Sequence, residues 1–153
     1  MTIDELLARE SIRKTLAAYN SSGDRARFDE MMEQFTEDGV IELPGGARYE
    51  GRDAIRGALS GVKDTATKAP APAPNARPAM TFLRHNITTC HIELTGENTA
   101  SVRTYYNCYT DIGPDHCGYY ADTFRKVGDR WLIAHRKCRL DWSSPDSMMG
   151  GRR

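Results

Sequence analysis

The chain has 153 residues, which is enough for one domain with a core of its own. Basic and acidic residues number 21 each, so the zero net charge gives no electrostatic case for binding nucleic acid or an anionic membrane. No apolar run approaches the roughly 20 residues that cross a bilayer, and the charged start MTIDELLARE does not resemble a signal peptide. We therefore expect a cytoplasmic protein.

The first third of the chain has helical periodicity. Thr2 and Glu5 form a T-x-x-E capping box, and apolar residues recur at helical spacing from there to Tyr19, which predicts a first helix. A loop is expected at 20–24. A second helix is predicted from about residue 25 to 35, with Phe28 on its inward face.

A hairpin of residues 39–46 and 47–50 is expected next, followed by a short third helix over 51–59. Residues 60–79 are rich in alanine and proline, and alternating proline forbids a packed helix. We interpret them as a mobile flap within a single domain that spans 1–143. Residues 144–153 are expected to be a flexible C-terminal tail.

After the flap the periodicity changes to two, with strands expected at about 81–94, 99–112, 117–127 and 130–142. Helices followed by long antiparallel strands predict an α+β domain with the helices on one face of a curved sheet.

His85 lies in the first of these strands, FLRHNITTCHIEL, where period two places it on one face with Leu83, Ile87 and Thr89. A histidine in such surroundings is either a hydrogen-bonded core residue or a proton carrier in a pocket. The other histidines are assigned structural roles: His91 at the surface, His116 in a loop at 111–117 and His135 in the last strand.

No metal or cofactor is expected. The histidines are not expected to cluster, and there is no glycine-rich nucleotide loop. The cysteines form no CxxC pair and are expected to be reduced thiols; they are Cys90, Cys108, Cys117 and Cys138.

Several segments, by their order and spacing, resemble the SnoaL-like branch of the NTF2-like superfamily. They are Tyr19, Asp24, EQFTEDGVIEL at 33–43, GRDAIRGAL at 51–59, RHNIT at 84–88 and GYYADTFRKVGDRWLIAHRKCRLDW at 118–142. This branch includes scytalone dehydratase, bile-acid 7α-dehydratase and hexachlorocyclohexane dehydrochlorinase. The resemblance implies an NTF2-like cone, in which three N-terminal helices pack on a curved, mostly antiparallel sheet and enclose a pocket.

Asp24 and His85 match the positions of an Asp–His pair in those enzymes. The resemblance implies that His85 removes a proton, that Asp24 orients its ring and that Tyr19 assists at a substrate oxygen. On the other interpretation Asp24 only caps the second helix and His85 is a core residue. Other proteins of this fold have no active site, so the resemblance alone does not assign chemistry.

Further candidates to contact a substrate are polar or aromatic residues of the later strands and the second helix. Tyrosines combine apolar area with a hydrogen-bonding tip, and charges facing inward would hold a substrate oxygen. Which face of the strands at 99–112 and 117–127 looks inward stays open, because one bulge would exchange the faces. The candidates are Tyr105, Asn107, Tyr120, Arg125 and Phe28.

With Asp24 and His85 at these positions, the resemblance implies a cofactor-independent lyase, a dehydratase-type enzyme acting on a small hydrophobic, cyclic molecule of aromatic or steroid-like character. The strand at 99–112 lacks the second catalytic histidine of scytalone dehydratase, which makes scytalone itself an unsuitable substrate. The alternatives are a non-catalytic small-ligand-binding or assembly subunit, and an isomerase or epoxide hydrolase on the same scaffold. Apolar residues on the uncovered face of the sheet predict a homo-oligomer, and the family resemblance implies a dimer or a trimer.

Overall fold

A computed structural model describes residues 1–67 and 79–149 of the chain. Its elements are α1 (Ile3–Asp24), α2 (Phe28–Met32), β1 (Phe35–Glu42), β2 (Arg48–Glu50), α3 (Arg52–Thr67), β3 (Arg84–Leu94), β4 (Thr99–Thr110), β5 (Gly113–Val127) and β6 (Arg130–Ser143). The strands form one six-stranded sheet in the order β2-β1-β6-β5-β4-β3. The predicted α+β class is confirmed.

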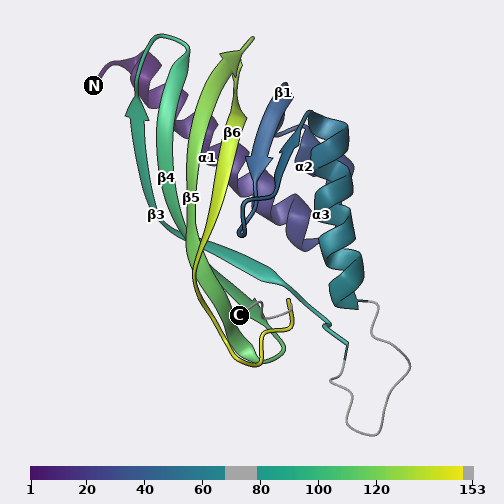
Figure 1. The fold of residues 1–153 in the computed structure, drawn as a ribbon. Helices are drawn as coiled ribbons and strands as arrows, with labels where there is room; N and C mark the ends of the chain where they lie inside the picture. Colours follow the sequence, from purple (N-terminus) through teal and green to yellow (C-terminus); the bar gives the residue numbers. More distant parts are fainter. Residues whose placement is uncertain (68–78, 150–153) are drawn as a thin grey trace, which may run out of the picture.

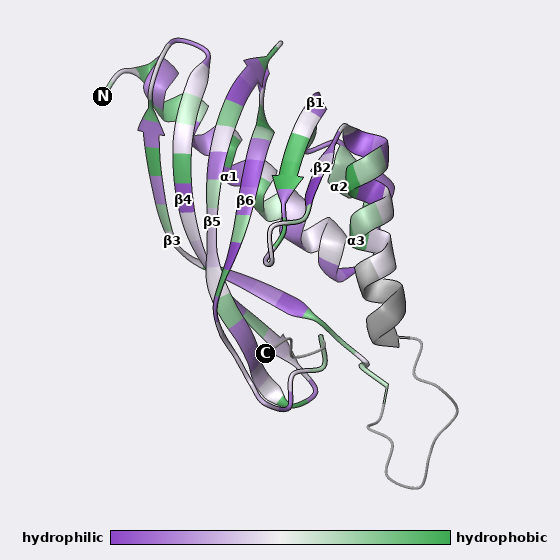
Figure 2. Cartoon of the chain, in the orientation of Figure 1, coloured by the Kyte–Doolittle hydropathy of each residue, from purple (hydrophilic) through white to green (hydrophobic). Residues whose placement is uncertain are grey.

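The sheet is strongly twisted, and α1 crosses one of its faces behind β3 to β6, while α3 lies beside β1 and β2 (Figure 1). The strands alternate hydrophilic and hydrophobic residues along their length (Figure 2), and in β4 every second side chain is buried. The buried apolar residues of α1 pack on the inward face of the sheet; they are Ala8, Ile12, Leu16 and Tyr19.

Hydrogen bonds fix α1 on the sheet as well. The Thr15 hydroxyl donates to the carbonyl of Trp131 at 2.6 Å, and the guanidinium of Arg9 donates to the carbonyl of Ile92 at 2.6 Å. The capping box predicted for Thr2 and Glu5 is confirmed, with both reciprocal bonds present. The helix is therefore held both at its first turn and across the sheet.

The boundaries near the second helix differ from the prediction. The first helix runs on to Asp24, and α2 has only five residues. Phe35 begins a strand because it pairs with Ile133 in a parallel ladder and is fully buried. This long-range pairing outweighs the local helical spacing of the apolar residues. Because β1 and β2 come between α2 and α3, the three helices are not one uninterrupted N-terminal block.

The third helix extends to Thr67, so the first part of the predicted flap is helical. Residues 68–78 of that flap lie outside the described residues. Residues 144–149, expected as a flexible tail, instead contact the end of the sheet: Ser147 is buried and hydrogen-bonded to Asp115. Among the described residues, no helix is both long and apolar enough to cross a membrane.

The four long strands lie close to their predicted positions, with two corrections. A register shift between Ile87 and Cys90 exposes Thr89, so the face shared by His85 and Ile87 continues through Cys90 instead. The predicted loop at 111–117 is only a turn, because Thr110 pairs directly with Gly113. His116 therefore lies in β5, not in a loop.

Candidate active site

Asp24 and His85 meet where the end of α1 lies beside β3. The Asp24 Oδ1 atom is 2.7 Å from His85 Nδ1, and Asp24 Oδ2 accepts a 3.0 Å hydrogen bond from the backbone N–H of His85. The side chains are 9% and 20% exposed, respectively. A carboxylate can only accept, so the hydrogen of a neutral His85 ring sits on Nδ1 and Nε2 keeps a free lone pair.

The capping interpretation of Asp24 does not fit its place in the chain. Asp24 is the last residue of α1, while the N-cap position of α2 is Arg27, which makes no side-chain capping bond. A carboxylate in the last turn of a helix opposes the helix dipole, so local helix energetics do not favour it there. The two bonds to His85 supply the favourable interaction.

A second carboxylate–histidine pair lies opposite the first. His116 Nδ1 is 2.7 Å from Asp115 Oδ1, and the His116 ring faces the His85 ring edge-on with 6.1 Å between centroids. Burial lowers the pKa of His116, which favours its neutral form. His116 was expected in a loop at 111–117, with a structural role. The signal for its pairing was the adjacent Asp115 in the sequence.

Asp115 is fully buried, and its carboxylate is satisfied from several directions. It accepts hydrogen bonds from the Ser147 hydroxyl at 2.6 Å, the backbone N–H of Met148 at 2.8 Å and the Thr110 hydroxyl at 3.0 Å. Burial opposes its ionisation, but these donors and His116 hold the pKa of Asp115 below its ordinary value. The charge that orients His116 thus depends on residues 147 and 148.

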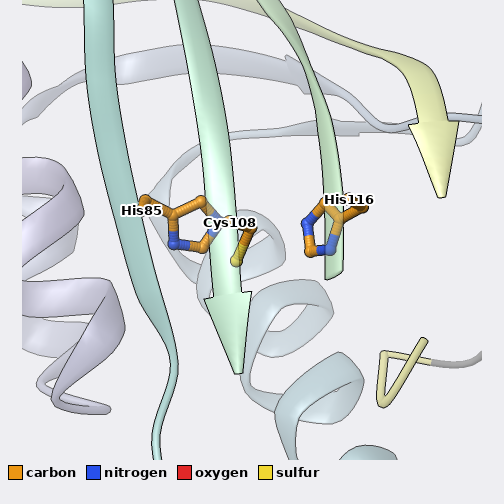
Figure 3. Close-up of side chains that lie close together, drawn as sticks. All are labelled: His85, Cys108 and His116. Atoms are coloured by element: carbon orange, nitrogen blue, oxygen red, sulfur yellow. The ribbon is translucent and has the colours of Figure 1, made fainter. Parts of the chain in front are cut away.

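Cys108 lies between the two histidines on the neighbouring strand (Figure 3). One ring nitrogen from each histidine and the Cys108 sulfur lie within 4.8 Å of one another. Burial, together with the charges of Asp115 and Asp24, raises the pKa of the Cys108 thiol to about 12. The expectation that the histidines do not cluster was wrong, because strand pairing brings together residues that are far apart in the sequence.

Stacked aromatic rings extend from the histidines toward α1. The Tyr106 ring centroid is 6.0 Å from those of His85 and His116, and Tyr106 stacks on Tyr120 at 4.7 Å. Tyr120 meets Tyr19 edge-on at 6.2 Å. Tyr19 is therefore linked to the Asp24–His85 pair through two intervening rings, and burial raises its pKa above the ordinary value.

Arg136 adds a buried cation next to these rings. Its guanidinium lies 4.2 Å from the ring centroid of Tyr19 and 4.0 Å from that of Tyr120, and it binds Asp122 through two hydrogen bonds of 2.9 and 2.6 Å. Burial opposes the charge, but Asp122 holds the pKa of Arg136 above its ordinary value. Its Nη1 atom is buried without a hydrogen-bond partner among the described residues.

The other candidate residues lie elsewhere. Tyr105 and Asn107 are exposed on the face of β4 opposite to Cys108. Arg125 is 44% exposed and pairs with Asp38, and Phe28 packs against the core from α2. Of the five candidates, only Tyr120 belongs to the ring stack beside His85.

The remaining histidines and the surface hollow lie outside this site. His91 is exposed, and His135 binds Glu42 on the β1–β6 side of the sheet. An open hollow near the start of α3 contains neither His85 nor Asp24; it is lined by Glu37, Glu50, Gly51, Arg52, Asp53 and Ala54.

Comparisons with known proteins identify the family and the fold of this chain. The model of the SnoaL-like domain family matches residues 4–137. A putative scytalone dehydratase from Novosphingobium aromaticivorans DSM 12444 has a similar structure, with a TM-score of 0.77, 21% identity and coverage of 94% of this chain and 91% of that one. A hexachlorocyclohexane dehydrochlorinase from Novosphingobium barchaimii LL02 gives a TM-score of 0.75 at 13% identity, covering 94% and 92%.

A protein of unknown function with a cystatin-like fold from Nostoc punctiforme PCC 73102 is also similar, with a TM-score of 0.72, 18% identity and coverage of 91% and 92%. At these identities the structural likeness establishes the fold alone. No match was found among curated proteins.

Proposed function

Because the chain belongs to the family of SnoaL-like domains, we propose that it is a cofactor-independent lyase that eliminates water or a similar leaving group from a small hydrophobic, cyclic substrate. The observation that carries this proposal is the contact of 2.7 Å between Asp24 and His85. The structural neighbours include proteins named as a dehydratase and a dehydrochlorinase, which supports a lyase-type reaction.

In the proposed reaction His85 is the base. Its Nε2 lone pair takes a proton from a substrate carbon, the electron pair left on that carbon forms the double bond, and the leaving group departs from the adjacent carbon with its bonding electrons. A departing hydroxide takes the proton from the His85 imidazolium and leaves as water. Asp24 keeps the hydrogen on Nδ1 and stabilises the imidazolium ion as it forms. The two hydrogen bonds from one carboxylate to the ring and the backbone of His85 support this orienting role.

In this proposal the substrate lies against the stacked rings of Tyr106 and Tyr120, which extend from His85 toward Tyr19. Stacked aromatic rings favour a flat or cyclic apolar molecule over a charged one. Tyr19 assists at a substrate oxygen in this proposal, and its raised pKa supports it because the buried phenol keeps its proton and remains a donor. An isomerase or an epoxide hydrolase would use the same proton transfer with a different substrate.

The test uses cyclic β-hydroxy ketones as probes, because loss of water from them gives a conjugated product that absorbs in the ultraviolet. We expect His85→Gln to lower kcat by about 10²- to 10⁴-fold, the usual contribution of a positioned general base. Asp24→Asn should lower kcat with little change in KM, because it alters the tautomer and not the substrate contacts.

His91→Gln is the matched control, since His91 is an exposed histidine on the same strand. It should leave turnover unchanged. If the wild-type chain turns over substrate and both His85→Gln and Asp24→Asn have the same kcat as the wild-type chain, the mechanism is excluded. No turnover in the wild-type chain, with ligand affinity independent of both residues, would instead favour a non-catalytic binding subunit.

A further inference from the structure

We infer that His85, Cys108 and His116 form a binding site for a thiophilic divalent cation of the Zn²⁺ type. The three residues occupy one row across the sheet, because His85 pairs with Cys108 and Cys108 pairs with His116 in antiparallel registers. Paired residues on adjacent strands point to the same face, so all three side chains face one another on the inward side (Figure 3).

The chemistry of the donor set fits such a cation. Zinc binds imidazole nitrogen and thiolate sulfur, and open zinc sites use three protein ligands with a fourth position left for water. The two imidazoles and the thiol here are the donor set of two histidines and one cysteine. Hard cations such as Mg²⁺ and Ca²⁺ prefer oxygen ligands and are disfavoured.

Each histidine already has the partner that a metal-bound histidine needs. Nδ1 of His85 is bound to Asp24 and Nδ1 of His116 to Asp115, both at 2.7 Å. A carboxylate on one ring nitrogen fixes the tautomer and makes the other nitrogen a better ligand. Both Nε2 lone pairs are therefore free to bind one cation, and the two carboxylates compensate its charge.

The distances require only a small closure. The donor atoms lie within 4.8 Å of one another, whereas tetrahedral zinc with bonds of 2.0–2.3 Å places its ligands about 3.3–3.6 Å apart. Side-chain movements of about 1 Å bring them into range. Cys108 binds as thiolate, so each cation that binds releases the thiol proton to solvent.

Occupation of this site has a consequence for the proposed elimination. The cation takes the His85 Nε2 lone pair that proton abstraction requires, so bound zinc and the base function exclude each other. This inhibitory effect rests on the proposed function, whereas cation binding itself does not. Zinc binding with no lyase activity would refute only the inhibition, and activity without zinc binding would refute only the site.

The experiment is a Co²⁺ titration of the full-length chain, freed of any polyhistidine tag and treated with chelator. Cobalt stands in for zinc because tetrahedral Co²⁺ has visible bands and a thiolate ligand adds a charge-transfer band in the near ultraviolet. We expect one equivalent to bind with both signals and Zn²⁺ to displace it. Cys108→Ser should abolish the charge-transfer band.

Two further variants make the result decisive. Cys117→Ser removes the thiol next to His116 on β5 and should leave the spectrum of bound Co²⁺ unchanged. Asp115→Asn should weaken the Co²⁺ affinity by about 10- to 100-fold. Circular dichroism checks that each variant is folded. If Cys108→Ser unfolds, His116→Gln takes its place, and we expect it to lower the Co²⁺ affinity at least tenfold. Absence of tetrahedral Co²⁺ binding, or a charge-transfer band that survives in folded Cys108→Ser, would overturn the site.

Discussion

The charged side chain of Arg136 is fully buried in the core, where Asp122 and two tyrosine rings contact its guanidinium in place of water. Removing one partner of a buried ion pair leaves an uncompensated charge, which costs about 3–5 kcal/mol. We therefore expect Asp122→Asn to lower the free energy of unfolding by about that amount in urea titrations.

The matched control is Asp38→Asn, which removes the acid of an exposed aspartate–arginine pair, with side chains 69% and 44% exposed. Solvent-exposed pairs contribute about 0–1 kcal/mol, so this variant should be close to wild type. Equal losses in the two variants would show that burial does not set the cost of breaking these pairs.

At the same scale, the sequence predicted the contact between Asp24 and His85 but not the contacts of His116 and Cys108. Asp24 and His85 were found because they match family positions, although the sequence alone left Asp24 as a capping residue. His116 was missed because it lies in β5 only if that strand starts at Gly113. That start is set by the two-residue turn after Thr110, which the alternation of apolar and polar residues does not reveal. Cys108 faces both histidines only through strand register, which composition and spacing do not encode.

Among the elements, the segment after β6 is bound to Asp115 by one buried hydroxyl and by backbone N–H groups. The Ser147 hydroxyl donates at 2.6 Å to the Asp115 carboxylate. Hydrogen bonds to charged groups contribute about 1.5–3 kcal/mol, so Ser147→Ala should lower the free energy of unfolding by about that amount in chemical denaturation. Ser101→Ala, at an exposed position on β4, is the control and should change it by less than about 0.5 kcal/mol. Similar values for both variants would mean that this segment does not stabilise the sheet.

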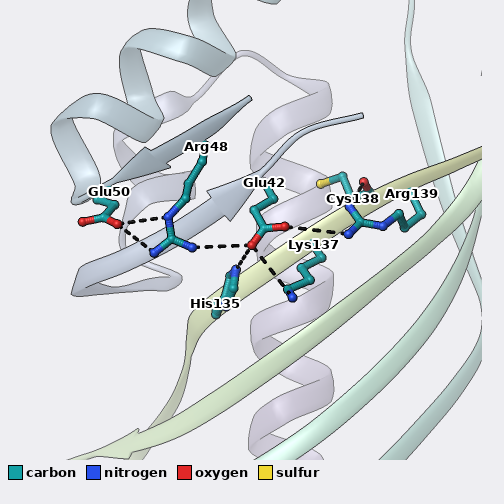
Figure 4. A network of polar contacts seen from close by, with 7 residues as sticks. All are labelled: Glu42, Arg48, Glu50, His135, Lys137, Cys138 and Arg139. Atoms are coloured by element: carbon teal, nitrogen blue, oxygen red, sulfur yellow. Dashed lines mark hydrogen bonds and ion pairs between the residues drawn. The ribbon is translucent and has the colours of Figure 1, made fainter. Parts of the chain in front are cut away.

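The pairing of β1 with β2 and β6 brings Glu42 into contact with basic side chains (Figure 4); they are Arg48 from β2 and His135, Lys137 and Arg139 from β6. Burial opposes ionisation, but the hydrogen bond from His135 and the neighbouring positive charges hold the pKa of Glu42 below its ordinary value of 4.5. The unfolded chain therefore binds this proton more readily than the folded one.

It follows that Glu42 stabilises the fold above its unfolded pKa and that this contribution disappears as pH falls through the folded pKa. The free energy of unfolding of Glu42→Gln should lie below that of wild type at neutral pH, and the two curves should converge on acidification below about pH 4. Glu97→Gln, in an exposed turn, should follow the wild-type curve. A constant gap between wild type and Glu42→Gln across this range would contradict the assigned pKa shift.

The element boundaries also show what local patterns decide. The capping box at Thr2 and the period of β4 were predictable because each depends on residues close in sequence. The end of α2 was not predictable. Phe35 fits the helical spacing of the apolar residues, but it lies in β1 because it pairs with Ile133. Helix propensity is a weak preference that tertiary pairing overrides.

At the scale of the whole molecule, the outer face of β4 carries exposed aromatic residues. Tyr105 and Tyr109 are 45% and 41% exposed, and burying them against a second copy would remove apolar surface from water. We expect a dimer or a trimer by sedimentation velocity, and Tyr105→Glu should shift it toward monomer. Leu7→Glu, at an exposed apolar position on α1, is the control and should keep the oligomer. A wild-type chain that sediments as a monomer at all concentrations would exclude this assembly.

The alternation of buried and exposed residues along β4 has a consequence for divergence. Cys108 and Tyr106 belong to one face of the strand, and Tyr105 and Asn107 belong to the other. Substitutions on one set leave the environment of the other nearly unchanged, because the backbone separates them. A lineage of this fold can therefore change its assembly partner while its chemistry is conserved, or change its chemistry while its assembly is conserved, through mutations in the same strand.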